Sequence, residues 1–340
     1  MSERLTSFIS ESKERVNRAS FKCSLWVGKH SVNLFSEYDH FIPFFRGKGV
    51  EYVSSIPGWG IDENPSETEY SIIYLPDEES ELIFDYENKT LYALGKLEDY
   101  KDGQALAYLS FWLTEAQRQA ESIYTLHSSA LTVKEKGVLM IGHSGAGKTS
   151  IMLDLCQKYD CEVISNDLTF VKHNPVSRDL YLIEGTKEIR LRLASIEANF
   201  PQLKYLFSGQ PRSSWETKTI VMPNDIGLKT ADSPRKLDSI FEIHLDNKGK
   251  DDLVVRREDG IVVRFRLYED MSRIVRGSAI SVFGENNQIL GYIPSLDSYE
   301  LHRKRVDSIE AMMSETGIIS VSGGNLSQIT EAIYRISHQA

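Results

Sequence analysis

The first hundred residues alternate between apolar and polar positions in short runs. After a stretch of helical periodicity at residues 1–20, alternation over residues 21–35 predicts two strands joined by a glycine turn. The same pattern predicts a strand at residues 70–75 and a β-hairpin over residues 81–94. We therefore expect the chain to begin with a small, mostly β region.

The pattern becomes helical at residue 104 and strand-like at residues 127–133. Residues 137–141 form a short apolar run, typical of a buried strand, and helical periodicity returns after Lys148. Further strands are predicted at residues 161–167, 168–173, 180–183, 186–193, 239–245, 253–257, 261–267 and 318–322, with a hairpin turn at residues 258–260. Helices are predicted at residues 104–126, 193–207, 268–277, 296–314 and after residue 325.

The loop between the 137–141 run and the following helix reads GHSGAGKT, which fits the phosphate-binding pattern G-x-x-x-x-G-K-[ST] without departure. Glycines let the backbone bend sharply, and the free N–H groups of a helix N-terminus attract phosphate. We expect ATP and Mg²⁺ as cofactors, with Lys148 reaching the β- and γ-phosphates and the Thr149 hydroxyl holding Mg²⁺. The expected cofactor-binding residues are Gly142, Ser144, Gly145, Ala146, Gly147, Lys148, Thr149 and Ser150. The alternative is a glycine-rich strand-to-helix turn with an incidental lysine.

The irregular strand spacing and the many hairpins argue against a simple doubly wound sheet. We predict an α/β fold with α+β character, in which a phosphate-loop domain on a mixed, hairpin-rich sheet occupies residues 104–340. Residues 1–103 form the mostly β region. It contains no chemical constellation of its own, and we hypothesise that it helps to select the substrate.

Composition narrows the class of protein. The net charge of −10 argues against nucleic acid or an anionic membrane as the main partner. No apolar run approaches the roughly 20 residues that span a bilayer, and the charged N-terminus lacks a signal-peptide pattern. Cys23, Cys156 and Cys161 are odd in number and lack metal-ligand spacing. We expect a cytoplasmic protein.

Outside the glycine-rich loop, two residues are candidates for catalysis. Asp167 lies 18 residues after Thr149, at the end of an apolar strand, where a carboxylate can meet the metal or the attacking hydroxyl. His127 begins the strand that precedes the phosphate-loop strand and could orient that carboxylate. The alternative is structural in both cases, namely a polar cap at a strand end and a histidine in the core.

Four arginines and a glutamate are weaker candidates. Arg190 and Arg192 are spaced by two and so share one face of a strand, whereas Arg273 and Arg276 fall on a predicted helix. Each pair could clamp transferred phosphoryl charge or an anionic substrate, or could form weak surface ion pairs. Glu184 is a second candidate carboxylate.

His127-Ser128-Ser129-Ala130, the phosphate loop and Ser165-Asn166-Asp167 together resemble the kinase domain of HPr kinase/phosphorylase and its relatives. The resemblance covers about residues 125–195. It implies a mixed sheet, a histidine at position 127 that assists the catalytic carboxylate, and unchanged roles for Lys148 and Thr149.

Two features depart from the pattern of that family. Asn166 stands where HPr kinases have one of two paired aspartates, and an amide cannot act as a base at neutral pH. The chain also lacks a recognisable arginine–glycine loop for docking HPr. Both departures argue against HPr itself as the substrate.

The sequence thus predicts an ATP-dependent kinase that phosphorylates a serine-type hydroxyl of a small molecule or peptide. Asp167, His127 and Lys148 are the predicted catalytic residues, and Thr149 and Asp167 the metal ligands. We expect no nucleic-acid or membrane partner, and a homo-oligomer is left open. Two alternatives remain: a regulatory HPr-type kinase/phosphorylase acting on a carrier protein, and a nucleotide-gated ATP-binding module without phosphotransfer.

Overall fold

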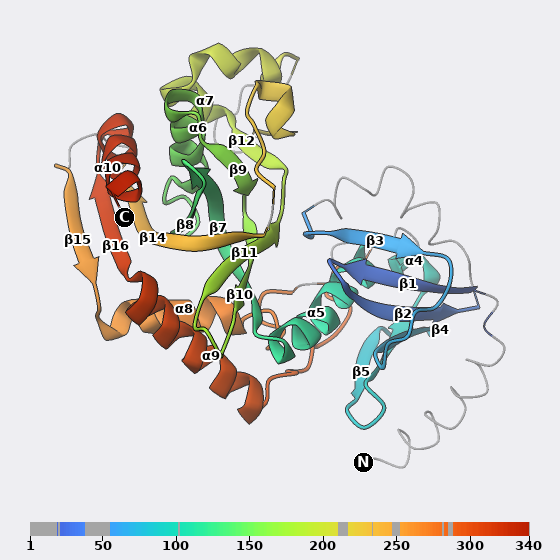
Figure 1. Cartoon of the computed structure of the whole chain (residues 1–340). Helices are drawn as coiled ribbons and strands as arrows, with labels where there is room; N and C mark the ends of the chain where they lie inside the picture. Colours follow the sequence, from blue (N-terminus) through green and yellow to red (C-terminus); the bar gives the residue numbers. More distant parts are fainter. Residues whose placement is uncertain are drawn as a thin grey trace. The chain divides into compact units, whose positions relative to one another are not determined.

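The computed structural model describes residues 19, 21–37, 55–100, 103–209, 217–232, 234–246, 252–280, 282–284 and 288–339 (Figure 1). The chain divides into two compact units, Met1–Ala120 with Ser272–Leu301, and Glu121–Met271 with His302–Ala340. This division assigns the helix that follows residue 103 to the first unit, whereas the sequence pattern places the boundary before it. The helix expected at residues 1–20 lies, apart from residue 19, outside the described residues.

The first unit is built on a six-stranded mixed sheet with the order β3-β1-β2-β4-β6-β5. Its strands are β1 Phe21–Val27, β2 His30–Ser36, β3 Trp59–Asp62, β4 Ser71–Pro76, β5 Glu81–Asp85 and β6 Thr90–Gly95. The β1–β2 and β5–β6 pairs are the two expected hairpins, while β2–β4 and β4–β6 run parallel. The small, mostly β N-terminal region is therefore confirmed.

Helix α5, Gln104–Ala120, covers part of this sheet through contacts with β1 and β2, after the short helix α4, Leu97–Tyr100. The expected continuation to residue 126 is wrong. Ser122 has a φ of +59°, which ends the helical path, and Ile123 already belongs to a strand. The mostly apolar segment 123–126 is compatible with either element, and its pairing with a strand that is distant in sequence decides between them.

The second unit contains an eight-stranded mixed sheet with the order β11-β10-β7-β8-β14-β16-β15, and β9 also pairs with β7. Its strands are β7 Ile123–Val133, β8 Lys136–Ile141, β9 Glu162–Ser165, β10 Leu168–His173, β11 Leu180–Gly185, β14 Arg235–Leu245, β15 Val254–Glu258 and β16 Ile318–Gly323. β14 runs parallel to β8 and β16, whereas the β7–β8 and β10–β11 pairs are antiparallel. The structure confirms an α/β fold on a mixed, hairpin-rich sheet.

Strand β8 lies between β7 and β14 and is buried on both faces, as its apolar run predicts. Val138 and Met140 belong to the cluster of α6, Lys148–Tyr159, and α10, Leu326–Gln339. Leu139 and Ile141 belong to the opposite cluster, with α8, Ile261–Ser272, and α9, Tyr299–Ala311. Alternation along one strand thus separates two helical layers, which lie on the two faces of the sheet in Figure 1.

The strand expected at residues 261–267 is wrong, because this segment is helix α8. Val263, Leu267 and Met271 are buried at a spacing of four, so the helical period and not the strand period matches the core. The β-branched residues favoured a strand, and tertiary packing overrode that preference. The hairpin expected at residues 258–260 is also wrong, since β15 pairs with β16.

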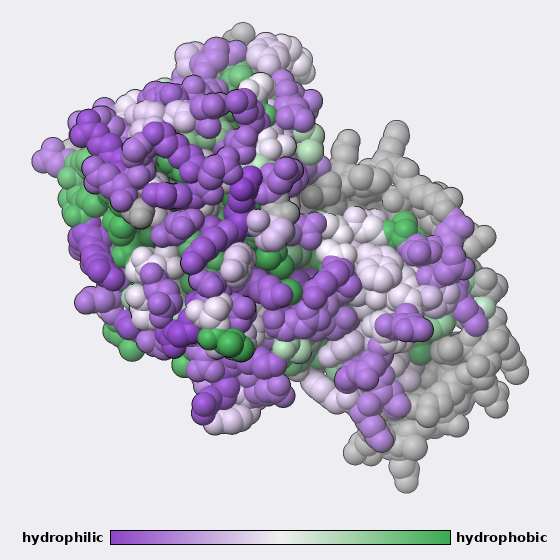
Figure 2. Space-filling model, viewed as in Figure 1, coloured by the Kyte–Doolittle hydropathy of each residue, from purple (hydrophilic) through white to green (hydrophobic). Residues whose placement is uncertain are grey.

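The remaining elements are a two-stranded sheet of β12, Ile189–Arg192, and β13, Lys218–Val221, and the helical segments between and after these strands. Those segments are α7 Leu193–Asn199, η1 Pro201–Phe207 and η2 Pro223–Ile226, with a π-helical turn, Met312–Thr316, that follows α9. Figure 2 shows a largely hydrophilic face of the molecule with apolar side chains over the β15 edge, where Val254 and Val255 are exposed. Among the described helices, none combines the length and the apolarity needed to cross a membrane.

Candidate active site

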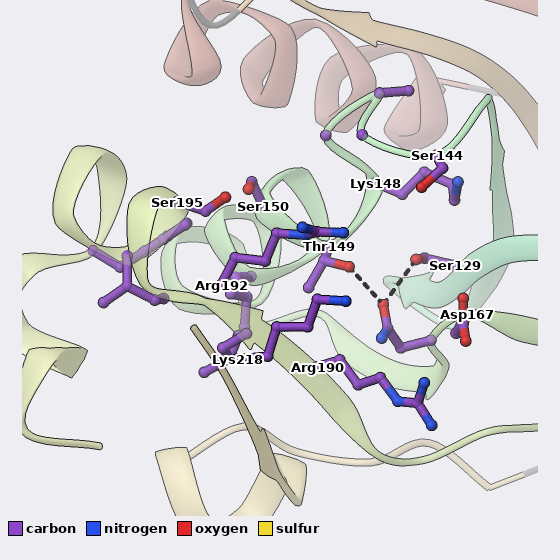
Figure 3. Close-up of a pocket in the computed structure, with 18 of the residues that line it drawn as sticks. Ser129, Ser144, Lys148, Thr149, Ser150, Asp167, Arg190, Arg192, Ser195 and Lys218 are labelled. Carbon is purple, nitrogen blue, oxygen red and sulfur yellow. Dashed lines mark hydrogen bonds between the residues drawn. The ribbon is translucent and has the colours of Figure 1, made fainter. Parts of the chain in front are cut away.

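A pocket of about 360 Å³ lies where β8 turns into α6 (Figure 3). It belongs entirely to the second unit. Its lining comprises the loop residues Ser144–Ser150 together with His127, Ser129, Leu153, Asn166, Asp167, Arg190, Leu191, Arg192, Ser195, Ile196, Phe200 and Lys218. Segments far apart in the sequence therefore converge on the glycine-rich loop.

The backbone of the loop uses its glycines where other residues would be strained. Gly145 has a φ of +83° and Gly147 a φ of +94°. A Cβ at position 147 would lie only 2.8 Å from Cβ of Leu245 on the adjacent strand β14. Leu245 in turn donates its backbone N–H to the Ala146 carbonyl at 2.9 Å. The loop thus requires glycine for its path and for its packing against β14.

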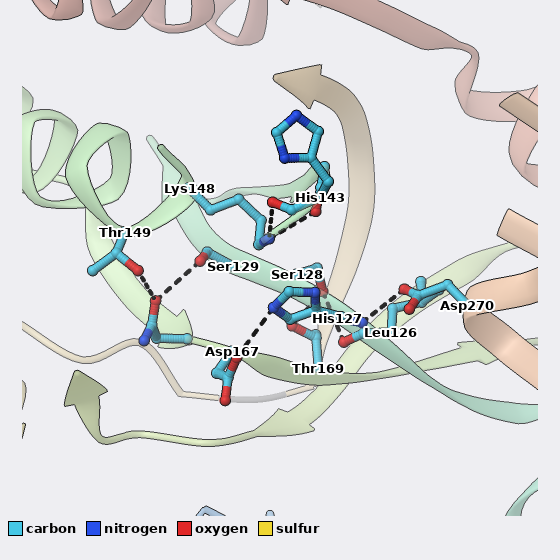
Figure 4. A network of polar contacts seen from close by, with 12 residues as sticks. Leu126, His127, Ser128, Ser129, His143, Lys148, Thr149, Asp167, Thr169 and Asp270 are labelled. Atoms are coloured by element: carbon cyan, nitrogen blue, oxygen red, sulfur yellow. Dashed lines mark hydrogen bonds and ion pairs between the residues drawn. The ribbon is translucent and has the colours of Figure 1, made fainter. Parts of the chain in front are cut away.

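Lys148 opens helix α6 and turns back over the loop. Its Nζ donates to the carbonyls of Gly142 at 2.7 Å and His143 at 3.2 Å (Figure 4). The ammonium group is therefore held over the glycine loop, beside the N-terminus of α6, where an anion would lie.

Asn166 connects the loop helix to β7. Its Oδ1 accepts hydrogen bonds from Oγ1 of Thr149 at 3.0 Å and from Oγ of Ser129 at 3.1 Å. Strand β9 ends at Ser165, and Asp167 takes a φ of +75°, so the strand does not continue regularly. Consequently Asn166 and Asp167 both line the pocket, whereas a regular strand would point them to opposite faces.

A hydrogen bond joins His127 to Asp167, with 3.2 Å between Nε2 and Oδ1. The pairing of β7 with β10 brings them together, since Leu168 lies opposite His127 and Ser128 donates its N–H to the Asp167 carbonyl at 3.0 Å. The backbone N–H of His127 donates to Oδ2 of Asp270 on α8 at 2.8 Å (Figure 4). This bond ties α8 to the strand that carries the histidine.

The surroundings of Asp167 favour its ionised form. The hydrogen bond from His127 is the largest influence that lowers the pKa of Asp167, and the charges of His127, Arg190 and Lys148 lower it further. Burial acts in the opposite direction but does not reverse the shift. Asp167 is therefore a carboxylate at neutral pH.

Of the weaker candidates, Arg190 and Arg192 line the pocket from β12. Glu184 does not line it. It lies on β11 opposite Phe170, and its charge acts on Lys187, whose pKa is lowered by burial and partly restored by Glu184. The sequence reasoning did not single out Lys218, which reaches the pocket from β13 because β12 and β13 pair across a long intervening segment.

Arg273 and Arg276 belong to the first unit and do not line the pocket. They follow the end of α8, instead of lying on the helix expected at residues 268–277. Arg276 is ion-paired with Asp297 through a contact of 3.1 Å.

The oxygen donors around Thr149 fit a magnesium ion better than a softer metal. Asn166 supplies an amide oxygen, Thr149 a hydroxyl, and Asp167 a carboxylate in the same pocket. Mg²⁺ prefers such hard oxygen ligands and completes its shell with water and phosphate oxygens. Among the described residues, no group of three or more His, Cys, Asp or Glu side chains gathers as a metal site.

Comparison with known proteins adds little to this picture. No protein-family model matches the chain, and a search of curated proteins found no match. The solved structures that match include the Hpr(Ser) kinase/phosphatase from Coxiella burnetii, with a TM-score of 0.24 and 16% identity over 39% of this chain and 70% of that chain. A TM-score this low does not establish a shared fold.

Proposed function

We propose that this protein is an ATP-dependent kinase that transfers the γ-phosphate to an alcohol hydroxyl of a small molecule or peptide. The observation that carries the proposal is the His127–Asp167 pair in the same pocket as Lys148 and Thr149. A glycine-rich loop with a lysine suits phosphate, and a carboxylate beside it suits an attacking hydroxyl. A protein that only binds a nucleotide would not need the carboxylate beside the loop.

In this proposal the loop residues hold the phosphates, and Lys148 leaves its loop carbonyls to pair with the β- and γ-phosphate oxygens. Thr149 and Asp167, with Asn166 between Thr149 and Ser129, would hold Mg²⁺. Bound Mg-ATP supplies the phosphoryl group and neutralises part of its negative charge. Phosphoryl transfer depends mainly on positioning and charge stabilisation, so this set of groups is chemically sufficient.

The role of Asp167 follows from its environment. Because its pKa is lowered, it is a weak base that is always available in the ionised form. It accepts a hydrogen bond from the acceptor hydroxyl and takes up the proton as the new O–P bond forms and the bond to the leaving nucleoside diphosphate breaks. His127 is a positioning residue in this scheme, since it holds Oδ1 of the carboxylate and leaves Oδ2 to contact both the metal and the hydroxyl.

The test follows the γ-phosphate of Mg-ATP by ³¹P NMR while free serine, serine peptides and a cell metabolite extract are offered in turn. We expect a new phosphoester resonance. In Asp167→Asn, formation of this ester should slow by about 100- to 10,000-fold, the range typical of a lost acid–base group. Asp160→Asn is the matched control, because Asp160 is an exposed surface residue paired with Lys229.

Other outcomes would favour the alternatives. Slow release of inorganic phosphate, unchanged in Asp167→Asn and without an ester, would contradict the kinase and favour a nucleotide-gated binding module. Phosphorylation of a carrier protein only, reversed by inorganic phosphate, would favour a regulatory kinase/phosphorylase.

A further inference from the structure

Three cationic side chains enter the pocket from a part of the fold separate from the glycine-rich loop. Arg190 and Arg192 come from β12, and Lys218 comes from β13. Figure 3 shows Arg192 and Lys218 extending into the pocket towards Thr149, with Arg190 on the side of Asp167. The charge of Arg190 helps to lower the pKa of Asp167, after the larger effect of His127.

The two strands place like charges against each other. In the register of the β12–β13 pair, Arg192 lies directly opposite Lys218. Two cations in this position repel each other and destabilise the strand pair. An anion bound between them would remove the repulsion, because guanidinium and ammonium groups both donate to carboxylate and phosphate oxygens.

The overall charge of the pocket supports the same conclusion. Among the residues that the structure describes, its lining contains four cationic side chains, Lys148, Arg190, Arg192 and Lys218, and one carboxylate, Asp167. The protein as a whole carries a net charge of −10, so this positive surface is local. Lys148 and Mg²⁺ already serve the phosphates in the proposed function, which leaves the β12–β13 cations for a different negative group.

We propose that Arg190, Arg192 and Lys218 form a second anion site that binds a carboxylate or phosphate group of the acceptor itself. The inference rests on the proposed kinase function and narrows its substrate to hydroxyl compounds that carry a negative charge. The hydroxyl of such a compound would lie at Asp167 while its anionic group contacts the cations of β12 and β13. This arrangement fixes the acceptor at two points, which orients it for in-line attack.

Inorganic sulfate serves as the probe, because it is a dianion and does not depend on knowing the acceptor. The protein is first saturated with magnesium and a non-hydrolysable ATP analogue, and sulfate is then titrated by calorimetry. We expect one further sulfate to bind to the nucleotide-loaded protein. If sulfate binds only to nucleotide-free protein, the second site is refuted, because the three cations would then be contacting the nucleotide itself. A sulfate that binds the loaded wild type and the variants described next equally well is an adventitious ion only, and this result too would overturn the second site.

The variants Arg192→Gln and Lys218→Gln remove one cation each and keep a polar, unbranched stem at the position. Sulfate affinity of the loaded protein should fall about tenfold in each, the cost of one lost charged hydrogen bond. Lys172→Gln is the matched control, because Lys172 is exposed on β10 and does not line the pocket. If Lys218→Gln lowers the affinity for the ATP analogue as much as the affinity for sulfate, then Lys218 binds the nucleotide and the inference is contradicted.

Failure of the inference and failure of the proposed function are distinguishable in this design. If the analogue does not bind, both fail together. If the analogue binds and neutral alcohols are phosphorylated as well as anionic ones, the kinase stands and the second anion site is refuted.

Discussion

Oδ1 of Asp167 lies 3.2 Å from Nε2 of His127, although the two residues belong to different parts of the chain. The pairing of β7 with β10 creates this relationship, and the left-handed backbone of Asp167 turns its carboxylate towards the histidine. Because the hydrogen bond from His127 is the largest influence on the pKa of Asp167, the histidine should govern the pH at which the carboxylate becomes ionised.

The first prediction concerns His127→Gln and the pH profile of phosphoryl transfer. Loss of the histidine should raise the pKa of Asp167 towards the ordinary value of 3.8, since its strongest lowering contact is removed. The acidic limb of kcat/KM should therefore move to higher pH. The rate at neutral pH should also fall, because His127 no longer holds the carboxylate in position. The control is His302→Gln, which removes a histidine that contacts Tyr268 and does not line the pocket. An unchanged limb would show that His127 does not act through Asp167.

The same shift implies a pH-dependent contribution to stability. The pKa of Asp167 is lower in the folded protein than in the unfolded chain, so the folded state gains stability while the carboxylate is ionised. This contribution is fully present above the unfolded pKa of about 3.8 and is lost as the pH falls through the lower folded value. Urea unfolding of the wild type and His127→Gln should therefore differ at neutral pH and converge at strongly acidic pH.

A second carboxylate at position 166 should strengthen magnesium binding. Asn166→Asp keeps an acceptor for the hydroxyls of Thr149 and Ser129, and it adds a negative charge beside them. Because Mg²⁺ prefers anionic oxygen ligands, we expect the half-saturating magnesium concentration for nucleotide binding to fall severalfold. Asn174→Asp, which makes the same change in an exposed turn, should leave it unaltered. A higher magnesium requirement in Asn166→Asp would contradict a metal at this position.

Two glycines of the loop should differ in their tolerance of alanine. Gly145→Ala should lower the free energy of unfolding by about 1–2 kcal/mol, because φ is +83°, although no described residue other than its chain neighbours lies within 4 Å of the new Cβ. Gly147→Ala should cost more. Its φ of +94° is also unfavourable for alanine, and in addition its Cβ would lie 2.8 Å from Leu245. Chemical denaturation of both variants measures the difference. Equal costs would mean that the loop moves away from β14 without penalty.

The buried ion pair of α5 predicts a large effect far from the pocket. Arg118 and Glu115 lie one turn apart, are 1% and 0% exposed and contact each other at 2.8 Å. Glu115→Ala would leave the arginine charge buried, and we expect the first unit to lose about 3–5 kcal/mol of stability. Hydrogen exchange of the α5 amides reports this loss. Glu331→Ala removes the partner of Arg335 on the exposed face of α10 and should cost about 0.5 kcal/mol at most.

The sequence by itself determined the local features of this protein. The glycine-rich loop and the β5–β6 hairpin are visible in it, because turn chemistry and periodicity act between residues that are close in the chain. The same local effects favour a strand where helix α8 forms, since its β-branched residues carry a strand preference that packing in the core overrides.

Only the tertiary structure decided which side chains meet in the pocket. Strand pairing brings His127 to Asp167 and Lys218 to Arg192, and the bend after β9 turns Asn166 to Thr149. The tertiary structure also decides that Arg273 belongs to the first unit, whereas the pocket residues belong to the second. These relationships join distant segments through burial and register, which depend on how the whole chain packs. No short stretch of residues contains that information.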